Sequence, residues 1–146
     1  MIGIVVSGHI NFASGMQSAM KAIVGEPEQM RFVDFVESMS TDDLETALRN
    51  AAQEVNSDDG VLFLTDIPGG SPANRASVIL MDSDKVEVLS GVNLPMIANA
   101  AFERDGASLN ELVDILQYIG KSTIQDMRKA LEAAIVEECI SEEEGL

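Results

Sequence analysis

Apolar residues along the chain form two patterns that alternate with one another. Residues 2–6 and 61–66 are almost continuous apolar runs, as in strands buried on both faces of a parallel sheet. Residues 31–36 and 86–90 are two further runs rich in strand-forming residues. After each run, apolar residues recur three or four positions apart, which is typical of a helix with one buried face. The pattern therefore predicts four strand–helix units.

Each predicted helix has a recognisable beginning or end. The first covers residues 12–23 and stops at Gly25, because glycine readily adopts the conformation that ends helices. The second covers about residues 42–55 and opens at Ser40 or Thr41. A third opens with Gly69-Gly70-Ser71-Pro72 and runs to about Met81, and a fourth covers residues 93–102 with Pro95 in its first turn.

The last third of the chain is predicted to be helical. Ser108 and Glu111 have the spacing of a capping box, in which two side chains satisfy free N–H groups at a helix start. Ser122 and Gln125 repeat that spacing, so a final helix is expected over residues 123–140. The methionines at helical spacing, and Cys139 in the last helix, are expected to be at least partly buried in the core.

Strand–helix alternation predicts an α/β fold with a doubly wound, mostly parallel sheet. The common order of four such strands is 2-1-3-4, with helices on both faces, and here a helical C-terminal segment follows. Residues 1–140 would form this single three-layer domain, and residues 141–146 an acidic tail. Strands one and three are then neighbours where the winding reverses, so the crevice at their carboxyl ends is the expected site.

The net charge of the chain limits the classes of partner that we expect it to bind. The chain of 146 residues has 9 Lys and Arg against 25 Asp and Glu, a formal net charge of −16. Nucleic acids and anionic lipids bind proteins through cationic contacts, so we expect neither as a partner. A partner with a basic docking face fits better, because opposite charges speed association.

Composition also bears on compartment and cofactors. No apolar run approaches the roughly 18 residues of a membrane span, and residues 2–6 are too short for a signal-peptide core, so we expect a cytoplasmic protein. Cys139 is the only cysteine, which excludes an intramolecular disulfide. With one cysteine and one histidine, we expect no metal site, and no cofactor is expected.

His9 is the chemically most distinctive residue. It stands at the exit of the first predicted strand, and Asp66 stands at the exit of the third. A neutral imidazole is a good nucleophile when one ring nitrogen is free and an acceptor holds the other. Asp66 is the predicted acceptor, and its charge would offset the positive charge that develops on the ring during attack.

The turn after the third strand has the composition of an anion site. Gly69 and Gly70 permit close approach of main-chain N–H groups, Ser71 fits the N-cap, and Pro72 fits the first helical position. A helix N-terminus offers free N–H donors and a partial positive charge, which favour phosphate. Gly69, Gly70 and Ser71 are therefore the phosphate-binding candidates beside His9.

Several other chemistries lack their motifs. No Gly-Lys-Ser/Thr follows the glycines, no Gly-x-Gly-x-x-Gly follows the first strand, and no Gly-x-Ser-x-Gly elbow is present. A nucleophilic histidine facing an anion cradle is suited to carry a phosphoryl group, whose transfer depends on positioning and N–H donors. Two alternatives stay open: a hydrolase that uses His9 as a base, and a non-enzymatic flavodoxin-like regulatory module in which His9 is structural.

Three motifs follow one another between residue 1 and about residue 119. They are Ile4-Val5-Val6-Ser7-Gly8-His9 with Phe12-Ala13-Ser14-Gly15-Met16, then Leu64-Thr65-Asp66-Ile67-Pro68-Gly69-Gly70-Ser71-Pro72-Ala73-Asn74, and finally Gly91-Val92-Asn93-Leu94-Pro95-Met96. In these motifs the sequence resembles the enzyme IIA component of the mannose-type sugar phosphotransferase system, which includes mannose, fructose, sorbose and N-acetylgalactosamine branches.

The resemblance implies a phosphotransferase component that works as a relay. His9 would be phosphorylated by the phosphocarrier protein HPr and would pass the group to a cognate enzyme IIB, which serves the membrane components IIC and IID in sugar uptake. Asp66 would hydrogen-bond His9, and the turn of residues 69–71 would lie against the phosphoryl group. Ser7 and Asn93 would line the same crevice as further phosphate-binding residues.

The resemblance also bears on assembly. Members form homodimers, and in some a C-terminal edge strand is exchanged between subunits. Residues 123–140 are predicted to be helical instead, which argues against the exchanged strand but not against the dimer. Because an acidic tail ends the chain, enzyme IIB is expected to be a separate protein. The phosphotransferase subunit of a dihydroxyacetone kinase system is the alternative within the superfamily, although its usual Gly-Ser-Ala turn differs from Gly-Gly-Ser-Pro here.

Overall fold

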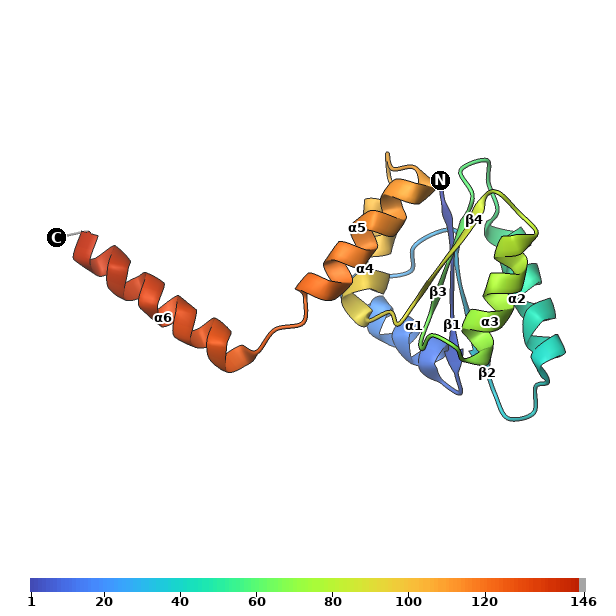
Figure 1. Ribbon diagram of the computed structural model, residues 1–146, viewed down its shortest axis with the longest axis horizontal. Helices are drawn as coiled ribbons and strands as arrows, with labels where there is room; N and C mark the ends of the chain where they lie inside the picture. The colour runs from blue at the N-terminus through green and yellow to red at the C-terminus, as the bar shows by residue number, and fades with distance from the viewer. Residues whose placement is uncertain (145–146) are drawn as a thin grey trace.

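A four-stranded parallel sheet lies at the centre of the computed structural model, which describes residues 1–144 (Figure 1). Its strands are β1 (Gly3–His9), β2 (Met30–Phe35), β3 (Val61–Thr65) and β4 (Val86–Ser90). Their order is β2-β1-β3-β4, and all three pairings are parallel. The predicted α/β class and the strand order 2-1-3-4 are therefore confirmed.

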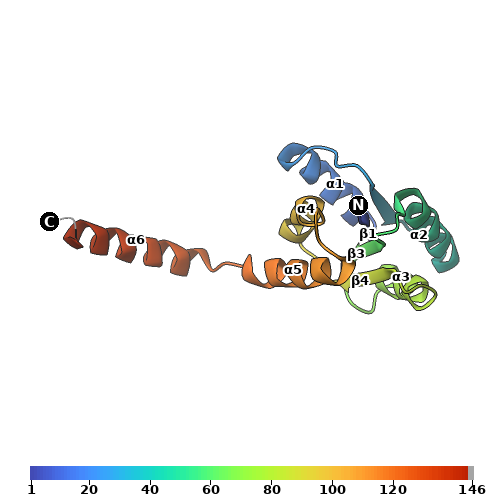
Figure 2. The same ribbon diagram turned by 90° about the horizontal axis from the view of Figure 1, so that it is seen from above.

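Helices cover both faces of the sheet and so complete three layers. Figures 1 and 2 show α1, α4 and α5 on one face and α2 and α3 on the other. The helices are α1 (Phe12–Ile23), α2 (Thr41–Val55), α3 (Ser71–Met81), α4 (Leu94–Glu103), α5 (Leu109–Ser122) and α6 (Met127–Glu144).

The central strands fill a separate core on each face, because successive side chains of a strand point to opposite sides. Val5 and Phe63 are buried against α2 and α3 in one cluster. Ile4, Val6 and Leu64 are buried in the other cluster, with residues of α1, α4 and α5. Burial on both faces explains the continuous apolar runs from which β1 and β3 were predicted.

Two capping boxes fix the starts of their helices: the one predicted at α5, and one at α2, where the sequence predicted only that Ser40 or Thr41 opens the helix. At α2, the Asp43 N–H donates to Ser40 Oγ at 3.0 Å, and the Ser40 N–H donates to Asp43 Oδ2 at 3.0 Å. At α5, Ser108 and Glu111 make the same reciprocal pair. At α3 the prediction was wrong by one residue: Gly70 is the N-cap, and Ser71 and Pro72 are the first two helical residues.

The start of the last helix also differs from the prediction. α5 continues through Ser122, and Thr123 is its C-cap, so Ser122 caps no following helix. Asp126 does so instead: its Oδ1 accepts from the N–H groups of Arg128 and Lys129 at 3.0 and 3.3 Å. Ser122 and Gln125 have the spacing of a capping box, but Ser122 lies in the last turn of α5 and therefore cannot be the N-cap of the next helix.

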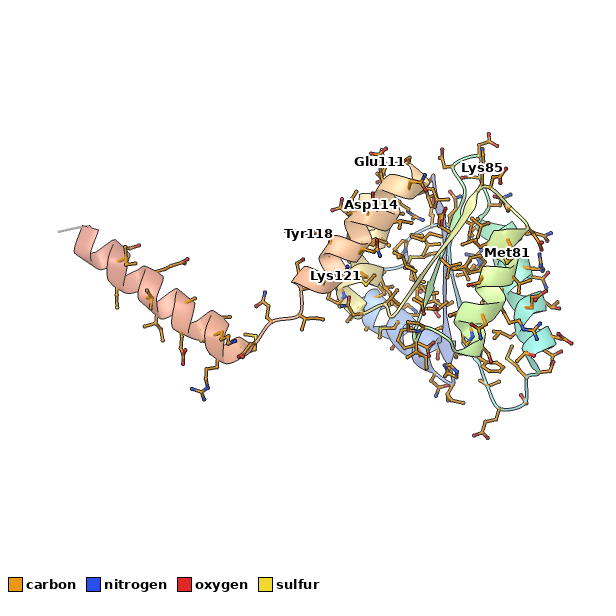
Figure 3. All side chains as sticks on the ribbon, in the orientation of Figure 1. Met81, Lys85, Glu111, Asp114, Tyr118 and Lys121 are labelled. Atoms are coloured by element: carbon orange, nitrogen blue, oxygen red, sulfur yellow. The ribbon has the colours of Figure 1, made fainter. Side chains whose placement is uncertain are left out.

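Helix α6 stands apart from the rest of the molecule (Figures 1 and 3). Met127, Leu131 and Ile135 are each 60% exposed, and Cys139 is exposed. The prediction that Cys139 and the methionine of this helix are partly buried is therefore wrong. Helical spacing of apolar residues shows which face of a helix is apolar, but it does not show whether another element packs against that face.

Two further predictions concern the chain as a whole. The division into a domain of residues 1–140 and a tail of residues 141–146 stays a prediction; α6 extends to Glu144, and residues 145 and 146 lie outside the described residues. Among the helices of residues 1–144, none is both long and apolar enough to cross a membrane.

Candidate active site at the carboxyl ends of the strands

His9 and Asp66 meet where β1 and β3 end. β1 ends at His9, Asp66 directly follows the last residue of β3, and the register pairs Ser7 with Thr65. One carboxylate oxygen, Asp66 Oδ2, lies 2.8 Å from the main-chain nitrogen of His9 and 2.7 Å from its ring nitrogen Nδ1. Two bonds to one oxygen fix both the backbone and the ring of the histidine. The predicted pairing of these residues is present in the geometry.

The ionisation state of Asp66 decides which ring nitrogen is free. Burial of the Asp66 carboxyl opposes ionisation, but hydrogen bonds from the His9 N–H, the His9 ring and the Ile67 N–H outweigh it and keep the pKa of Asp66 below its usual value. An ionised carboxylate can only accept hydrogen bonds, so Nδ1 must be the donor. In the neutral ring the lone pair therefore resides on Nε2.

The open edge of the His9 ring lies beside the backbone of Gly70. The His9 side chain is 41% exposed, while that of Asp66 is 13% exposed. A Cβ built on Gly70 would lie 2.7 Å from His9 Cε1 and 3.4 Å from Nε2. Only a residue without a side chain lets the turn approach the ring so closely. On another side, Phe35 packs edge-on against the imidazole, with ring centroids 5.9 Å apart.

The N-terminus of α3 follows Gly70 and offers free donors. Gly70 provides no side-chain cap, and Pro72 has no N–H. Within the described chain, the N–H groups of Ser71 and Ala73 donate to no protein acceptor. Gly69 has a φ of +83°, which favours glycine and turns the chain into the helix. This local arrangement suits an anion near Nε2, because the helix end adds a partial positive charge.

Two of the predicted site residues have structural partners instead. Ser7 is fully buried, and its hydroxyl donates to the main-chain oxygen of Val33 at 2.8 Å. Asn93 caps α4 by accepting from the Met96 N–H at 3.1 Å, and its amide donates to the Gly120 oxygen at 3.1 Å. Ser7 thus ties β1 to β2, and Asn93 ties the start of α4 to the last turn of α5. The geometry brings His9, Asp66 and Gly70 together most closely.

Sequence reasoning did not single out Ile10 or Ile67, which flank the two central residues. Ile10 follows His9 with a φ of +52°, an unusual conformation for a β-branched residue, and its N–H donates to the Phe35 oxygen at 2.8 Å. Ile10 is 47% exposed and Ile67 is 55% exposed. Nothing in the sequence predicts the Ile10 conformation, because glycine or asparagine is the usual signal for a positive φ.

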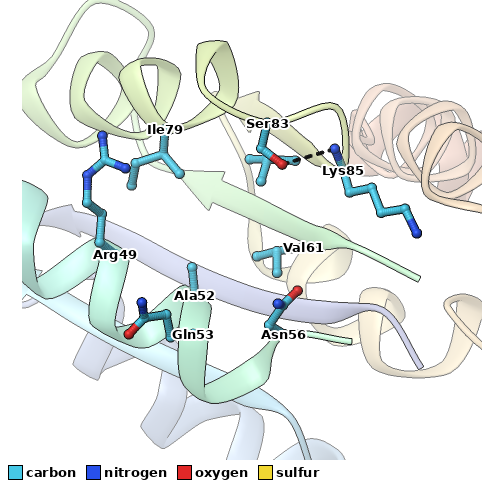
Figure 4. Close-up of a pocket in the computed structure, with 9 residues that line it drawn as sticks. Arg49, Ala52, Gln53, Asn56, Val61, Ile79, Ser83 and Lys85 are labelled. Atoms are coloured by element: carbon cyan, nitrogen blue, oxygen red, sulfur yellow. Dashed lines mark hydrogen bonds between the residues drawn. The ribbon is translucent and has the colours of Figure 1, made fainter. Parts of the chain in front are cut away.

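A hollow at the opposite end of the sheet is separate from this site. It has a volume of about 220 Å³ and lies between α2 and α3 near the first residues of β3 and β4 (Figure 4). The Arg49 guanidinium on its wall is paired with Glu45 and Asp82, at 3.2 and 2.8 Å. Across residues 1–144, no cluster of three or more His, Cys, Asp or Glu side chains is arranged to hold a metal ion.

Fold and site together define a doubly wound α/β protein with an oriented histidine and a helix N-terminus without a side-chain cap, at the point where the winding reverses. A family model described as "PTS system fructose IIA component" matches residues 3–117. The chain therefore belongs to this family, the mannose-type enzyme IIA components of the sugar phosphotransferase system.

Individual relatives agree with the family assignment. The chain is 34% identical over 137 residues to the mannose-specific EIIAB component of Escherichia coli K12, a match that covers 93% of this chain and 41% of that protein. It is 27% identical to the fructose-specific EIIA component of Bacillus subtilis, with 90% of each chain covered. The crystal structure of an EIIA component from Streptococcus agalactiae superposes with a TM-score of 0.82 at 30% identity, covering 88% of this chain and 99% of that one.

Proposed function

We propose that the protein is a phosphocarrier that receives a phosphoryl group on His9 from phospho-HPr and passes it to an enzyme IIB. The observation that carries this proposal is the pair of hydrogen bonds from His9 to Asp66 Oδ2, at 2.8 and 2.7 Å. They leave Nε2 as the free nucleophilic nitrogen, beside the N-terminus of α3. Family membership supports the same chemistry, since the matched relatives are named as components of sugar phosphotransferase systems.

The proposed step exchanges one nitrogen–phosphorus bond for another. The Nε2 lone pair attacks phosphorus as the bond to the donor's histidine breaks, and that electron pair returns to the donor ring. Nδ1–H stays on the His9 ring, and Asp66 offsets the positive charge that develops there. Delivery to enzyme IIB repeats the exchange with His9 as the leaving group.

The N-terminus of α3 would hold the oxygens of the group in transit. The unpaired N–H groups of Ser71 and Ala73 can donate to phosphoryl oxygens, and the helix adds partial positive charge. Gly70 leaves the space that the group needs, since a side chain there would lie against Nε2. No metal is required for this role, because the donors are main-chain groups already in position.

Protein partners must reach His9 at the carboxyl ends of the strands, where its side chain is partly exposed. The net charge of −16 favours donors and acceptors with basic faces. Ile10 and Ile67 add exposed apolar contacts on either side of the histidine. We further propose that the protein acts in the cytoplasm as a homodimer, and that the membrane components IIC and IID take part only through enzyme IIB.

Phosphorylation with purified components tests this function. Incubation with phosphoenolpyruvate, enzyme I and HPr should add the mass of one phosphate, and acid should remove it, since phosphohistidine is acid-labile. His9→Ala, which removes the only histidine, should abolish the adduct while leaving the circular dichroism spectrum unchanged. An acid-stable adduct, or one that survives in His9→Ala, contradicts the proposal. Turnover of phosphate esters without a protein donor would indicate a hydrolase, and no labelling at all a regulatory module.

A further inference from the structure

The turn that lies against the His9 ring contains two consecutive glycines, which restrain a backbone poorly. Figure 1 shows this turn between β3 and α3. Across the turn, the Gly70 N–H donates to the Ile67 oxygen at 3.4 Å, which is a long hydrogen bond. A Cβ built on Gly69 would meet no atom within 4 Å, so little packs against that side of the residue. The position of the turn therefore depends on hydrogen bonds from outside it.

Asn74, in the first turn of α3, makes two such bonds. Its main-chain N–H donates to the Gly70 oxygen at 2.9 Å, and its side-chain nitrogen Nδ2 donates to the Gly69 oxygen at 3.1 Å. A carbonyl oxygen can only accept, so the NH2 group of the amide must face it. Asn74 is exposed, so its side chain fills no space in the core. The bond to Gly69 is thus the structural reason for an amide at this position.

These two bonds also set the direction of the N–H groups at the site. In a trans peptide unit, the C=O of one residue and the N–H of the next point in opposite directions. Because the Gly69 and Gly70 carbonyls are directed toward Asn74, the N–H groups of Gly70 and Ser71 point away from it. Within residues 1–144, the Ser71 N–H donates to no protein acceptor. Rotation of the Gly69–Gly70 peptide would redirect these donors and move the turn relative to the imidazole.

We propose that Asn74 is a positioning residue for phosphoryl transfer. Its side-chain amide holds the Gly69–Gly70 peptide so that the turn leaves room at Nε2 and directs its N–H groups at the incoming phosphoryl group. The inference rests on the proposed function of His9, and Asn74 acts through the backbone of the turn. Without the amide, two adjacent glycines would adopt several backbone conformations, and only a fraction of them would keep the productive geometry.

Asn74→Ala tests the role of the amide. Alanine favours a helix more than asparagine does, and the position is exposed, so the urea unfolding midpoint should change little. Rapid-quench transfer from phospho-HPr should slow by about tenfold. Transfer from the small donor phosphoramidate should slow by the same factor, because the defect lies beside His9 and not in docking. Val78→Ala is the matched control: Val78 is 41% exposed one turn further along α3, and both rates should stay normal.

Asn74→Asp separates the donor from the shape of the side chain. A carboxylate has nearly the shape of the amide but cannot donate a hydrogen bond, so this variant should be no faster than Asn74→Ala. Hydrogen exchange at the Gly70 N–H should be faster in both variants, because the turn is released. A native rate or native exchange in either variant, or a loss confined to phospho-HPr, would overturn the inference alone. Absence of labelling in the native chain would instead overturn the proposed function, and this inference with it.

Discussion

Asp66 holds His9 at two points, through the main-chain N–H at 2.8 Å and through ring nitrogen Nδ1 at 2.7 Å, and both bonds end on the same oxygen. One carboxylate therefore fixes the end of β1 and the orientation of the imidazole together. It can do so because β1 and β3 are neighbours and end at nearly the same level. The chemistry of the ring thus depends on the strand order of the sheet.

Asp66→Asn should slow phosphoryl transfer to His9 by about tenfold or more while the protein stays folded. An amide keeps the shape of the carboxyl group, but it carries no charge and can present its NH2 group to Nδ1, which favours the wrong tautomer. Rapid-quench transfer from phospho-HPr measures the rate, and circular dichroism checks the fold. An unchanged rate would show that Asp66 has no part in orienting the ring.

Gly70→Ala should reduce transfer by displacing the ring of His9. The added methyl group would lie 2.7 Å from Cε1, closer than real contacts allow, so either the imidazole or the turn must move. The expected result is a slower rate with a modest loss of stability, of about 1 kcal/mol. Rate and urea unfolding are measured on the same preparation.

Gly69→Ala is the matched control for that change. Its Cβ meets no atom within 4 Å, but its φ of +83° is unfavourable for alanine. We expect a loss of about 1 kcal/mol in unfolding free energy with a nearly normal transfer rate. Equal loss of rate in both variants would mean that the turn, and not the space beside Nε2, controls transfer.

Local sequence patterns were enough to predict the strands, their order and the meeting of the two central site residues. The strands were predicted because burial on both faces leaves a continuous apolar run, as in β3. The meeting of His9 and Asp66 followed from strand order, since the carboxyl ends of neighbouring parallel strands lie at one edge. The N-cap of α3 was misplaced because serine before proline is also a common helix start, and only the backbone shows that Gly70 takes this position.

Other features depend on contacts that no local pattern contains. Ser7 and Asn93 lie in motifs around the site, yet their side chains bond to Val33 and Gly120, which are 26 and 27 residues away in the chain. The apolar residues on the exposed face of α6 have the spacing of a buried helix face. Such spacing shows that one face of a helix is apolar, but it does not show what packs against that face. The positive φ of Ile10 goes against the preference of its residue type.

Ile10→Gly should weaken docking of the phosphoryl donor protein without changing the chemistry at His9. Glycine adopts a φ of +52° without strain, so it removes about 1–2 kcal/mol of backbone strain, partly offset by its greater freedom when unfolded. Stability should therefore rise or stay within about 1 kcal/mol. The apolar contact beside His9 is lost, and the KM for phospho-HPr should rise several-fold.

A small phosphoryl donor such as phosphoramidate distinguishes that effect from a change in the site. Its reaction with His9 needs no docking face, so Ile10→Gly should leave that rate unchanged. Met81→Ser is the control, since Met81 is 83% exposed at the far end of α3 and should affect neither donor. Equal loss with both donors would show that Ile10 supports the histidine rather than the partner.

Asp66 should also make stability depend on pH on the acid side. The pKa of its carboxyl is below the usual value because hydrogen bonds from His9 and Ile67 outweigh its burial. A group with a depressed pKa stabilises the fold fully above its unfolded value, about 4, and loses that contribution as pH falls through the folded value. The difference in unfolding free energy between the native protein and Asp66→Asn should thus be constant near neutrality and shrink below about pH 4.

Urea unfolding across that pH range measures this difference. Gly69→Ala is the control: it leaves the carboxyl untouched, so its unfolding free energy should differ from that of the native protein by an amount that does not vary with pH. A difference that grows on acidification would mean that the carboxylate is not the favoured form of Asp66 in the fold, and would remove the reason for assigning the proton to Nδ1.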